Sequence, residues 1–231
     1  MVSAFFKTNS MKKILVLGLL ALSFSTQAQT KEVFKKKGKT LIFINQDPTL
    51  NETTKKGLIK TYFKVFPKLA KDFNKNVTDT ITVTIDTAYD GVAYAHNGAI
   101  VISADWLKKK PTDTDVITHE VMHIVQAYPG HSGPGWLTEG IADYVREVYG
   151  VDNKGADWAL PNYSDKQNYD NSYRITARFL VWITQNFDKD FVTKMDSHLR
   201  AKTYSSELWK TFTGKDLDAL WQAYSANPSI S

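Results

Sequence analysis

Residues 118–146 read THEVMHIVQAYPGHSGPGWLTEGIADYVR, and this stretch decides how the rest of the chain is interpreted. Its H-E-x-x-H pattern places His119 and His123 four residues apart, so on a helix both imidazoles lie on one face and can reach a single ion. A catalytic zinc takes three protein ligands and keeps a fourth position open, and Glu139 can be the third ligand. Glu120 is placed to act as general base toward a zinc-bound water. The stretch therefore predicts one Zn2+ per chain.

Two helices joined by a tight loop account for the residues around this motif. Asp113 or Thr114 can cap the first helix, which should stop at the Pro-Gly pair within residues 128–130. A second helix is expected to begin near Gly135 and to carry the third candidate ligand. Asp143, four residues further on, is placed to accept a hydrogen bond from a ligand imidazole and so to fix its tautomer.

A motif this short also occurs by chance, so its histidines could be ordinary helix residues. The whole chain has only five His, however, and two of them fall in this register with acids between and after them. A metzincin would need Gly at position 126 and His at position 129, where Gln126 and Pro129 stand. Glu-x-x-x-Asp after H-E-x-x-H resembles the gluzincin arrangement of thermolysin and aminopeptidase N. The gap between the second His and the Glu, residues 124–138, is shorter here.

Residues 1–28 have the pattern of a signal peptide. Met11-Lys12-Lys13 precedes an apolar run at 14–22, and small residues end at Ala28, the expected cleavage point. The apolar run is too short to span a bilayer. We therefore expect residues 29–231 to form a single domain that is exported, periplasmic or secreted from a bacterium, with no stable membrane association. The absence of Cys is compatible with either compartment.

The net charge gives no indication of a nucleic-acid partner. The whole chain carries +5, but three of its lysines and no acid lie in residues 1–28, so the mature chain carries about +2. Such a charge is too small to argue for binding to nucleic acid or to an anionic membrane. The expected partner is a peptide or protein substrate, and the oligomeric state stays open.

The fold class expected from the remaining pattern is α+β. It comprises a small, mostly antiparallel N-terminal sheet, a zincin-type active-site helix and a helical C-terminal half. Asn97-Gly98 predicts a hairpin turn, and Pro67 should kink or split the first long helix. Strands are expected at 40–45, 81–85, 91–95 and 99–103, and helices at 51–73, 173–187, 191–202, 207–212 and 216–225.

Two further expectations concern the substrate. In gluzincins an edge strand before the zinc helix pairs with the peptide, and Ala99, Ile100 and Val101 are the candidate edge here, an interior strand being the alternative. Aminopeptidase N-like enzymes stabilise the oxyanion with a downstream Tyr, a place that Tyr173 occupies, with Tyr169 as second choice. The alternative is that Tyr173 only packs the start of a helix.

The chain also resembles the basic secretory protein family, zinc peptidases known from plants and also found in bacteria. The resemblance covers almost all of the mature chain and implies a compact peptidase domain with zinc ligands His119, His123 and Glu139 and the catalytic residue Glu120. Plant members carry cysteines, which this chain lacks. The matching segments are GVAYA (91–95), HEVMHIVQ (119–126), EGIADYVR (139–146), YRITARFL (173–180), TGK (213–215) and LW (220–221).

The function expected from the sequence is thus zinc-dependent hydrolysis of peptide bonds. No acidic motif for gripping a free amino terminus is obvious, which favours an endopeptidase. The alternative is a secreted zinc-containing binding or defence module with little turnover. An open fourth position and an intact Glu120 argue against that alternative, because a structural zinc site is normally closed by a fourth protein ligand.

Overall fold

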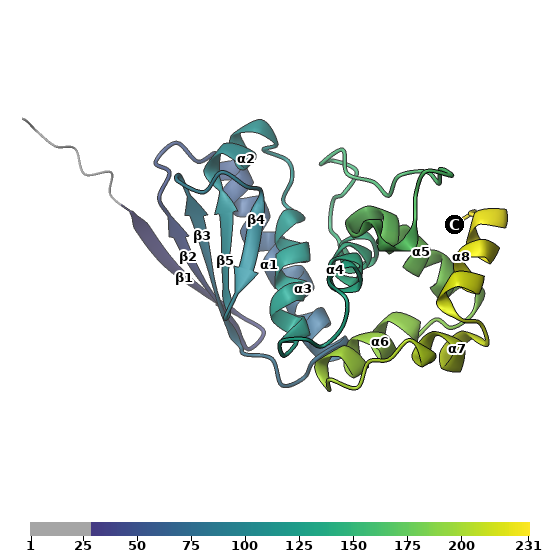
Figure 1. Cartoon of the computed structure of the whole chain (residues 1–231). Coiled ribbons are helices and arrows are strands. Elements are labelled where there is room, and N and C mark those ends of the chain that lie inside the picture. The colour runs from purple at the N-terminus through teal and green to yellow at the C-terminus, as the bar shows by residue number, and fades with distance from the viewer. Residues whose placement is uncertain (1–28) are drawn as a thin grey trace, which may run out of the picture.

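The structure, a computed structural model, describes residues 29–231; the expected signal peptide lies outside these residues. The described chain has an N-terminal sheet followed by helices (Figure 1), so the predicted α+β class is confirmed. The strands are β1 (Thr30–Lys36), β2 (Lys39–Asn45), β3 (Thr80–Asp86), β4 (Ala93–His96) and β5 (Ala99–Ser103). The helices are α1 (Glu52–Asp72), α2 (Ala104–Lys109), α3 (Val116–Gln126), α4 (Gly135–Tyr149), α5 (Tyr173–Asn186), α6 (Phe191–Arg200), α7 (Glu207–Thr213) and α8 (Leu217–Ala226), with a 3-10 turn at Tyr169–Asn171.

The sheet is mixed, whereas a mostly antiparallel sheet was predicted. Its strand order is β1-β2-β3-β5-β4. The outer pairs, β1–β2 and β4–β5, are antiparallel, and the inner pairs, β2–β3 and β3–β5, are parallel. The parallel pairs follow from the connections, because α1 carries the chain from the end of β2 back to the start of β3. Such a crossover delivers the next strand in the same direction.

The edge of the sheet next to the active-site helix is β4. The prediction that Ala99, Ile100 and Val101 form this edge is wrong, because β5 lies between β3 and β4 and is paired on both sides. The predicted hairpin itself is confirmed: Asn97 and Gly98 both have positive φ, as a tight two-residue turn requires. The hairpin places β4 outside β5, so β4 rather than β5 is the edge strand of the sheet.

Alternation along the strands places one face of the sheet in the core. Leu41 and Phe43 of β2 and Ile100 and Ile102 of β5 are fully buried, while the residues between them are partly exposed. Helices α1 and α3 pack on the sheet. Helix α1 begins at the expected cap, Asn51, and runs through Pro67 as one helix, so the alternative of a split helix is wrong.

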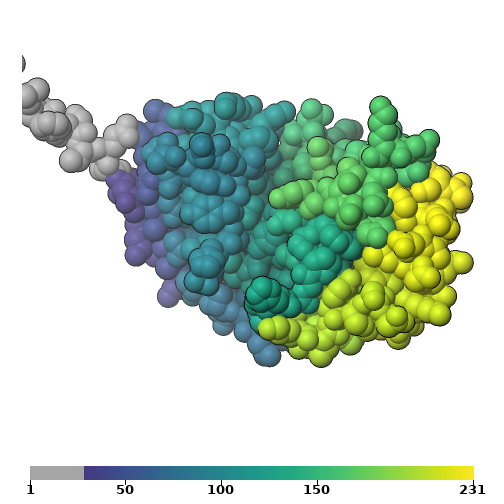
Figure 2. Space-filling view, in the orientation of Figure 1, coloured from purple at the N-terminus to yellow at the C-terminus, as the bar shows by residue number. Residues whose placement is uncertain are grey.

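Helix α3 connects the sheet to the helical half of the molecule, since it packs on α1 and β4 on one side and on α4 on the other. Helix α4 in turn packs closely on α5. A Cβ at Gly140 would lie 2.2 Å from Thr176 Cγ2, so Gly is needed for this approach. Figure 2 shows the N-terminal residues (purple to blue) and the C-terminal residues (green to yellow) as opposite sides of one continuous body.

One continuous cluster of buried side chains extends from the sheet to α8. Among the helices of residues 29–231, none combines the length and the apolar character that crossing a bilayer requires.

Candidate metal centre and active-site cavity

Helix α3 presents the first two candidate ligands. It begins after Asp115, one or two residues beyond the predicted caps Asp113 and Thr114, and ends at Ala127, whose left-handed φ of 44° stops the helix just before the predicted Pro-Gly breaker. Its apolar side chains face the core, as expected of a buried helix. His119 and His123 therefore share the one remaining face, which is directed at α4.

The ligand atoms of the two histidines and of Glu139 converge. The two Nε2 atoms are 3.0 Å apart, and Glu139 Oε2 lies 3.3 Å from each of them. Ligands at about 2.1 Å from a tetrahedral zinc are separated by roughly 3.4 Å, so the three separations match the face of such a coordination tetrahedron. The three side chains are also the only group of potential metal ligands found among the described residues. The donor set thus fits a zinc ion.

Each imidazole is oriented by a hydrogen bond at its other nitrogen. Asp143 Oδ1 lies 2.7 Å from His119 Nδ1, the contact that the four-residue spacing from Glu139 predicts. Gln126 Oε1 lies 2.7 Å from His123 Nδ1, and Gln126 Nε2 donates to the carbonyl of Thr138 at 2.9 Å. Gln126 was not among the predicted site residues. Both contacts fix the tautomer that leaves Nε2 free to bind a metal.

The charges of the site favour a cation between the rings. Burial by itself would lower the pKa of His119, but the hydrogen bonds that the ring donates to the carboxylates of Asp143 and Glu139 outweigh it and raise this pKa to about 10. Burial would likewise raise the pKa of Glu139, but the two imidazoles lower it to about 2. Surroundings that stabilise a positive charge on the His119 ring also stabilise a dication at the same place.

Glu120 lies close enough to His119, His123 and Glu139 for their charges to act on its carboxyl. Its side chain is buried, and Oε2 has no hydrogen-bond partner among the described residues. Burial raises the pKa of this carboxyl. An unpaired carboxylate oxygen in the interior is costly unless something binds to it. Glu120 lines the same cavity as the two histidines.

A cavity of about 1100 Å³ opens over this group. Val92 and residues 93–95 of β4 line it, as do the two histidines, Glu120 and Glu139. The remaining lining includes residues that the sequence did not identify as functional: Trp106, Asp113, Arg146 and Trp158. A cavity of this size is larger than a metal ion and a water need and is comparable to ligand-binding clefts.

Tyr173 lies at the mouth of the cavity. Its ring stacks on that of His119, with centroids 6.2 Å apart and planes 17° apart, and it is 53% exposed. The negative charge of Glu139 raises the pKa of Tyr173. Tyr169, the second choice, lies elsewhere: it donates to Asp218 and does not line the cavity.

The backbone that presents Tyr173 is strained. Ser172 and Tyr173 have φ values of 69° and 47°, two consecutive non-Gly residues in a region that costs about 1–3 kcal/mol each. Arg174, the next residue along the chain, lines the cavity, whereas Arg178 does not and donates to the carbonyl of Pro228.

Solved structures of zinc metallopeptidases share the fold of this chain. A mutant form of an M1 zinc metallopeptidase from Deinococcus radiodurans bound to a Tyr-Ser-Ala substrate superposes with a TM-score of 0.55 at 15% identity, over 88% of this chain and 53% of that one. Legionella pneumophila aminopeptidase A in complex with aspartic acid superposes with a TM-score of 0.51 at 14% identity, over 84% and 27%. This chain therefore spans about half, or less, of those proteins.

The chain belongs to the BSP family, described as peptidases of plants and bacteria, whose model matches residues 34–224. The resemblance found in the sequence is thereby confirmed. No curated protein sequence shows significant similarity to the chain.

Proposed function

We propose that the chain is an exported, zinc-dependent peptidase that hydrolyses peptide bonds in peptides or proteins. The observation that carries the proposal is the convergence of His119, His123 and Glu139 at 3.0–3.3 Å beside the unpaired buried oxygen of Glu120. Membership of a peptidase family supports the reaction, and the likeness in fold to M1 zinc metallopeptidases is compatible with the metal. Export rests on the sequence pattern of residues 1–28 alone.

In this proposal His119, His123 and Glu139 hold the zinc ion. Zinc bound there would act as a Lewis acid on the scissile carbonyl and would lower the pKa of a water molecule toward ~7. Glu120 accepts the proton of the attacking water and passes it to the leaving nitrogen. Asp143 keeps the His119 ring in the tautomer that this arrangement requires.

Tyr173 is the proposed donor to the oxyanion that forms from the scissile carbonyl. The stacking on His119 keeps its ring beside the candidate metal centre, and its exposure leaves the hydroxyl free to reach a substrate. A fixed donor at the place where negative charge develops is worth several kcal/mol in other hydrolases. The strained backbone at Ser172 and Tyr173 is consistent with a residue held in position for function.

The edge of β4 is the proposed docking strand for the substrate. Its residues line the cavity, and β5 is its single strand partner among the described residues. An extended peptide can therefore add to the free edge of β4 through main-chain hydrogen bonds, which brings one of its peptide bonds toward α3. Main-chain recognition of this kind serves an endopeptidase, because it does not require a free end of the substrate.

The test is elemental analysis of zinc and casein hydrolysis on purified residues 29–231, beside Glu120→Ala and a matched control, Glu147→Ala. Glu147 is an exposed acid of α4 that does not line the cavity of the metal centre. We expect one zinc per chain in all three proteins and loss of activity in Glu120→Ala alone. Zinc without turnover in the unaltered chain would support the binding or defence module instead. No zinc in any of them would overturn the proposal.

A further inference from the structure

The active-site cavity extends along α4 to a second polar cluster that the proposed chemistry does not use. Arg146 lies seven residues after Glu139, two helical turns further on and on the same face of α4. This spacing corresponds to about 10 Å along the helix axis, or the length of about three residues of an extended peptide. Both ends of this stretch line the same cavity. A peptide with its scissile bond near Glu120 therefore has room to pass Arg146.

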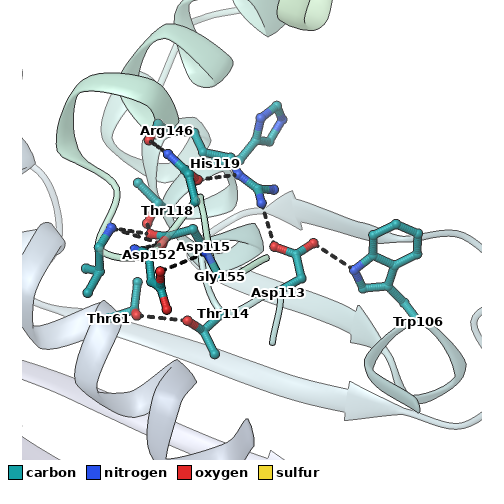
Figure 3. A network of polar contacts seen from close by, with 12 residues as sticks. Thr61, Trp106, Asp113, Thr114, Asp115, Thr118, His119, Arg146, Asp152 and Gly155 are labelled. Atoms are coloured by element: carbon teal, nitrogen blue, oxygen red, sulfur yellow. Dashed lines mark hydrogen bonds and ion pairs between the residues drawn. The ribbon is translucent and has the colours of Figure 1, made fainter. Parts of the chain in front are cut away.

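The guanidinium of Arg146 is held rigidly from several sides (Figure 3). Nη2 donates to Asp113 Oδ1 at 2.5 Å, and Nε donates to Asn153 Oδ1 at 3.2 Å. The ring of Trp158 lies over the guanidinium carbon at 4.5 Å. Asp113 is fixed in turn, because its other oxygen accepts a hydrogen bond from Trp106 Nε1 at 3.0 Å.

The third nitrogen of this guanidinium, Nη1, is not used by the fold. Among the described residues its neighbours Nε and Nη2 have protein acceptors and Nη1 has none. Arg146 is only 5% exposed, yet Nη1 is not one of the buried atoms without a partner, so it is reached from the cavity that Arg146 lines. An arginine that is already oriented loses little entropy when it binds a ligand. Asp113 neutralises the charge, so a neutral acceptor suffices and a carboxylate is not required.

We propose that Arg146 is a substrate-binding residue whose Nη1 donates a hydrogen bond to a main-chain carbonyl oxygen of a peptide in the cavity. The inference rests on the peptidase function proposed above. A main-chain acceptor is chosen because every peptide supplies one at regular spacing along β4, whatever its side chains. Arg146 would thus fix the position of the peptide along the edge strand, about three residues from the scissile bond.

The alternative is that Arg146 only holds the segment after α4, since the Asn153 side chain both accepts from its Nε and donates to its carbonyl at 2.7 Å. Two variants separate these roles. Arg146→Lys keeps a positive charge beside Asp113 but removes the planar donor group. Asn153→Ala removes the contacts with the segment and leaves Nη1 in place.

The experiment measures casein hydrolysis at varied substrate concentration for both variants. In parallel, it measures the binding of labelled tryptic casein peptides to the same variants in a Glu120→Gln background. We expect Arg146→Lys to raise KM and the peptide Kd by about 10-fold each, the effect of losing one buried hydrogen bond, with kcat changed less than about threefold. Asn153→Ala should lower the melting temperature and, because it removes only the acceptor of Arg146 Nε, should raise KM and Kd clearly less than Arg146→Lys does.

Other outcomes overturn the inference. Unchanged KM and Kd in Arg146→Lys, an equal rise in Asn153→Ala, or no peptide binding to Glu120→Gln would each do so. Peptides that bind but are never cleaved by the unaltered chain would contradict the peptidase function alone, and the Kd comparison would still decide the role of Arg146. If Arg146→Lys does not fold, the double variant Arg146→Met/Asp113→Asn, which removes both charges together, takes its place.

Discussion

The two candidate ligand histidines are oriented by chemically different partners, a carboxylate for His119 and an amide for His123. Asp143 could be predicted because a residue four positions after Glu139 on a helix faces the same way as the ligand. Gln126 could not be predicted. Gln126 is three residues after His123 and so near it on the helix, but a Gln side chain has many conformations, and its orientation here depends on the carbonyl of Thr138 lying 2.9 Å away on the next helix.

Substitution of Gln126 should therefore weaken the metal centre without removing a ligand. Gln126→Leu leaves His123 Nδ1 without its acceptor, and we expect zinc affinity to fall by about 10–100-fold, as for other contacts that orient metal ligands. Gln126→Glu keeps an acceptor oxygen but loses the donation to Thr138, so its affinity should lie between that of Gln126→Leu and that of the unaltered chain. Titration against a competing chelator measures this order, and equal affinities in all three proteins would contradict it.

At the scale of elements, α3 begins after Asp115, one or two positions beyond the predicted caps Asp113 and Thr114. Asp113, Thr114 and Asp115 are all of types found at helix starts, so the sequence could not choose among them. In the structure Asp115 precedes the helix without a side-chain cap to its backbone. Its buried carboxylate accepts instead from Thr118 Oγ1 at 2.6 Å and from the N–H groups of Val151 and Asp152 (Figure 3). These last donors lie beyond α4, so Asp115 joins the candidate metal helix to the segment that carries Trp158.

Removal of this carboxylate should destabilise the fold. Asp115→Ala leaves the part-buried N–H groups of Val151 and Asp152 without their acceptor and removes a fully buried side chain, and we expect the free energy of unfolding to fall by about 3 kcal/mol. Urea denaturation followed by circular dichroism measures the change. Asp105→Ala, which removes an exposed acid in a loose pair with Lys108, is the control and should change stability by less than about 0.5 kcal/mol. Similar losses in both variants would argue against a special role for Asp115.

The sequence predicted individual elements of the sheet better than their arrangement. The Asn97-Gly98 turn is a local signal, and it was predicted correctly. Strand β1 is not among the predicted strands, yet it pairs with β2 over its whole length across a Lys37-Gly38 turn. The strand order, and with it the edge beside α3, is set by packing between segments distant in the sequence, which no short pattern encodes.

At the scale of the whole molecule, the candidate ligands join its two halves. His119 and His123 lie on α3, which packs on the sheet side, and Glu139 lies on α4, which begins the helical side. The hydrogen bond from Gln126 Nε2 to the carbonyl of Thr138 is one of the few polar contacts between the two helices near the site. A zinc ion bound by all three side chains would therefore stabilise the packing of one half on the other.

Metal removal should accordingly lower the stability of the entire chain. A ligand at 100 times its Kd stabilises the folded state by about 2.7 kcal/mol. For a domain of about 200 residues, 1 kcal/mol moves the melting temperature by roughly 2–4 °C, so we expect chelation to lower it by roughly 5–11 °C. Differential scanning calorimetry with and without a chelator measures the shift. Glu120→Ala, which keeps all three ligands, should respond like the unaltered chain, and His123→Ala should melt low and not respond. A chelator effect of equal size in His123→Ala would mean that the metal acts elsewhere and would contradict the link between α3 and α4.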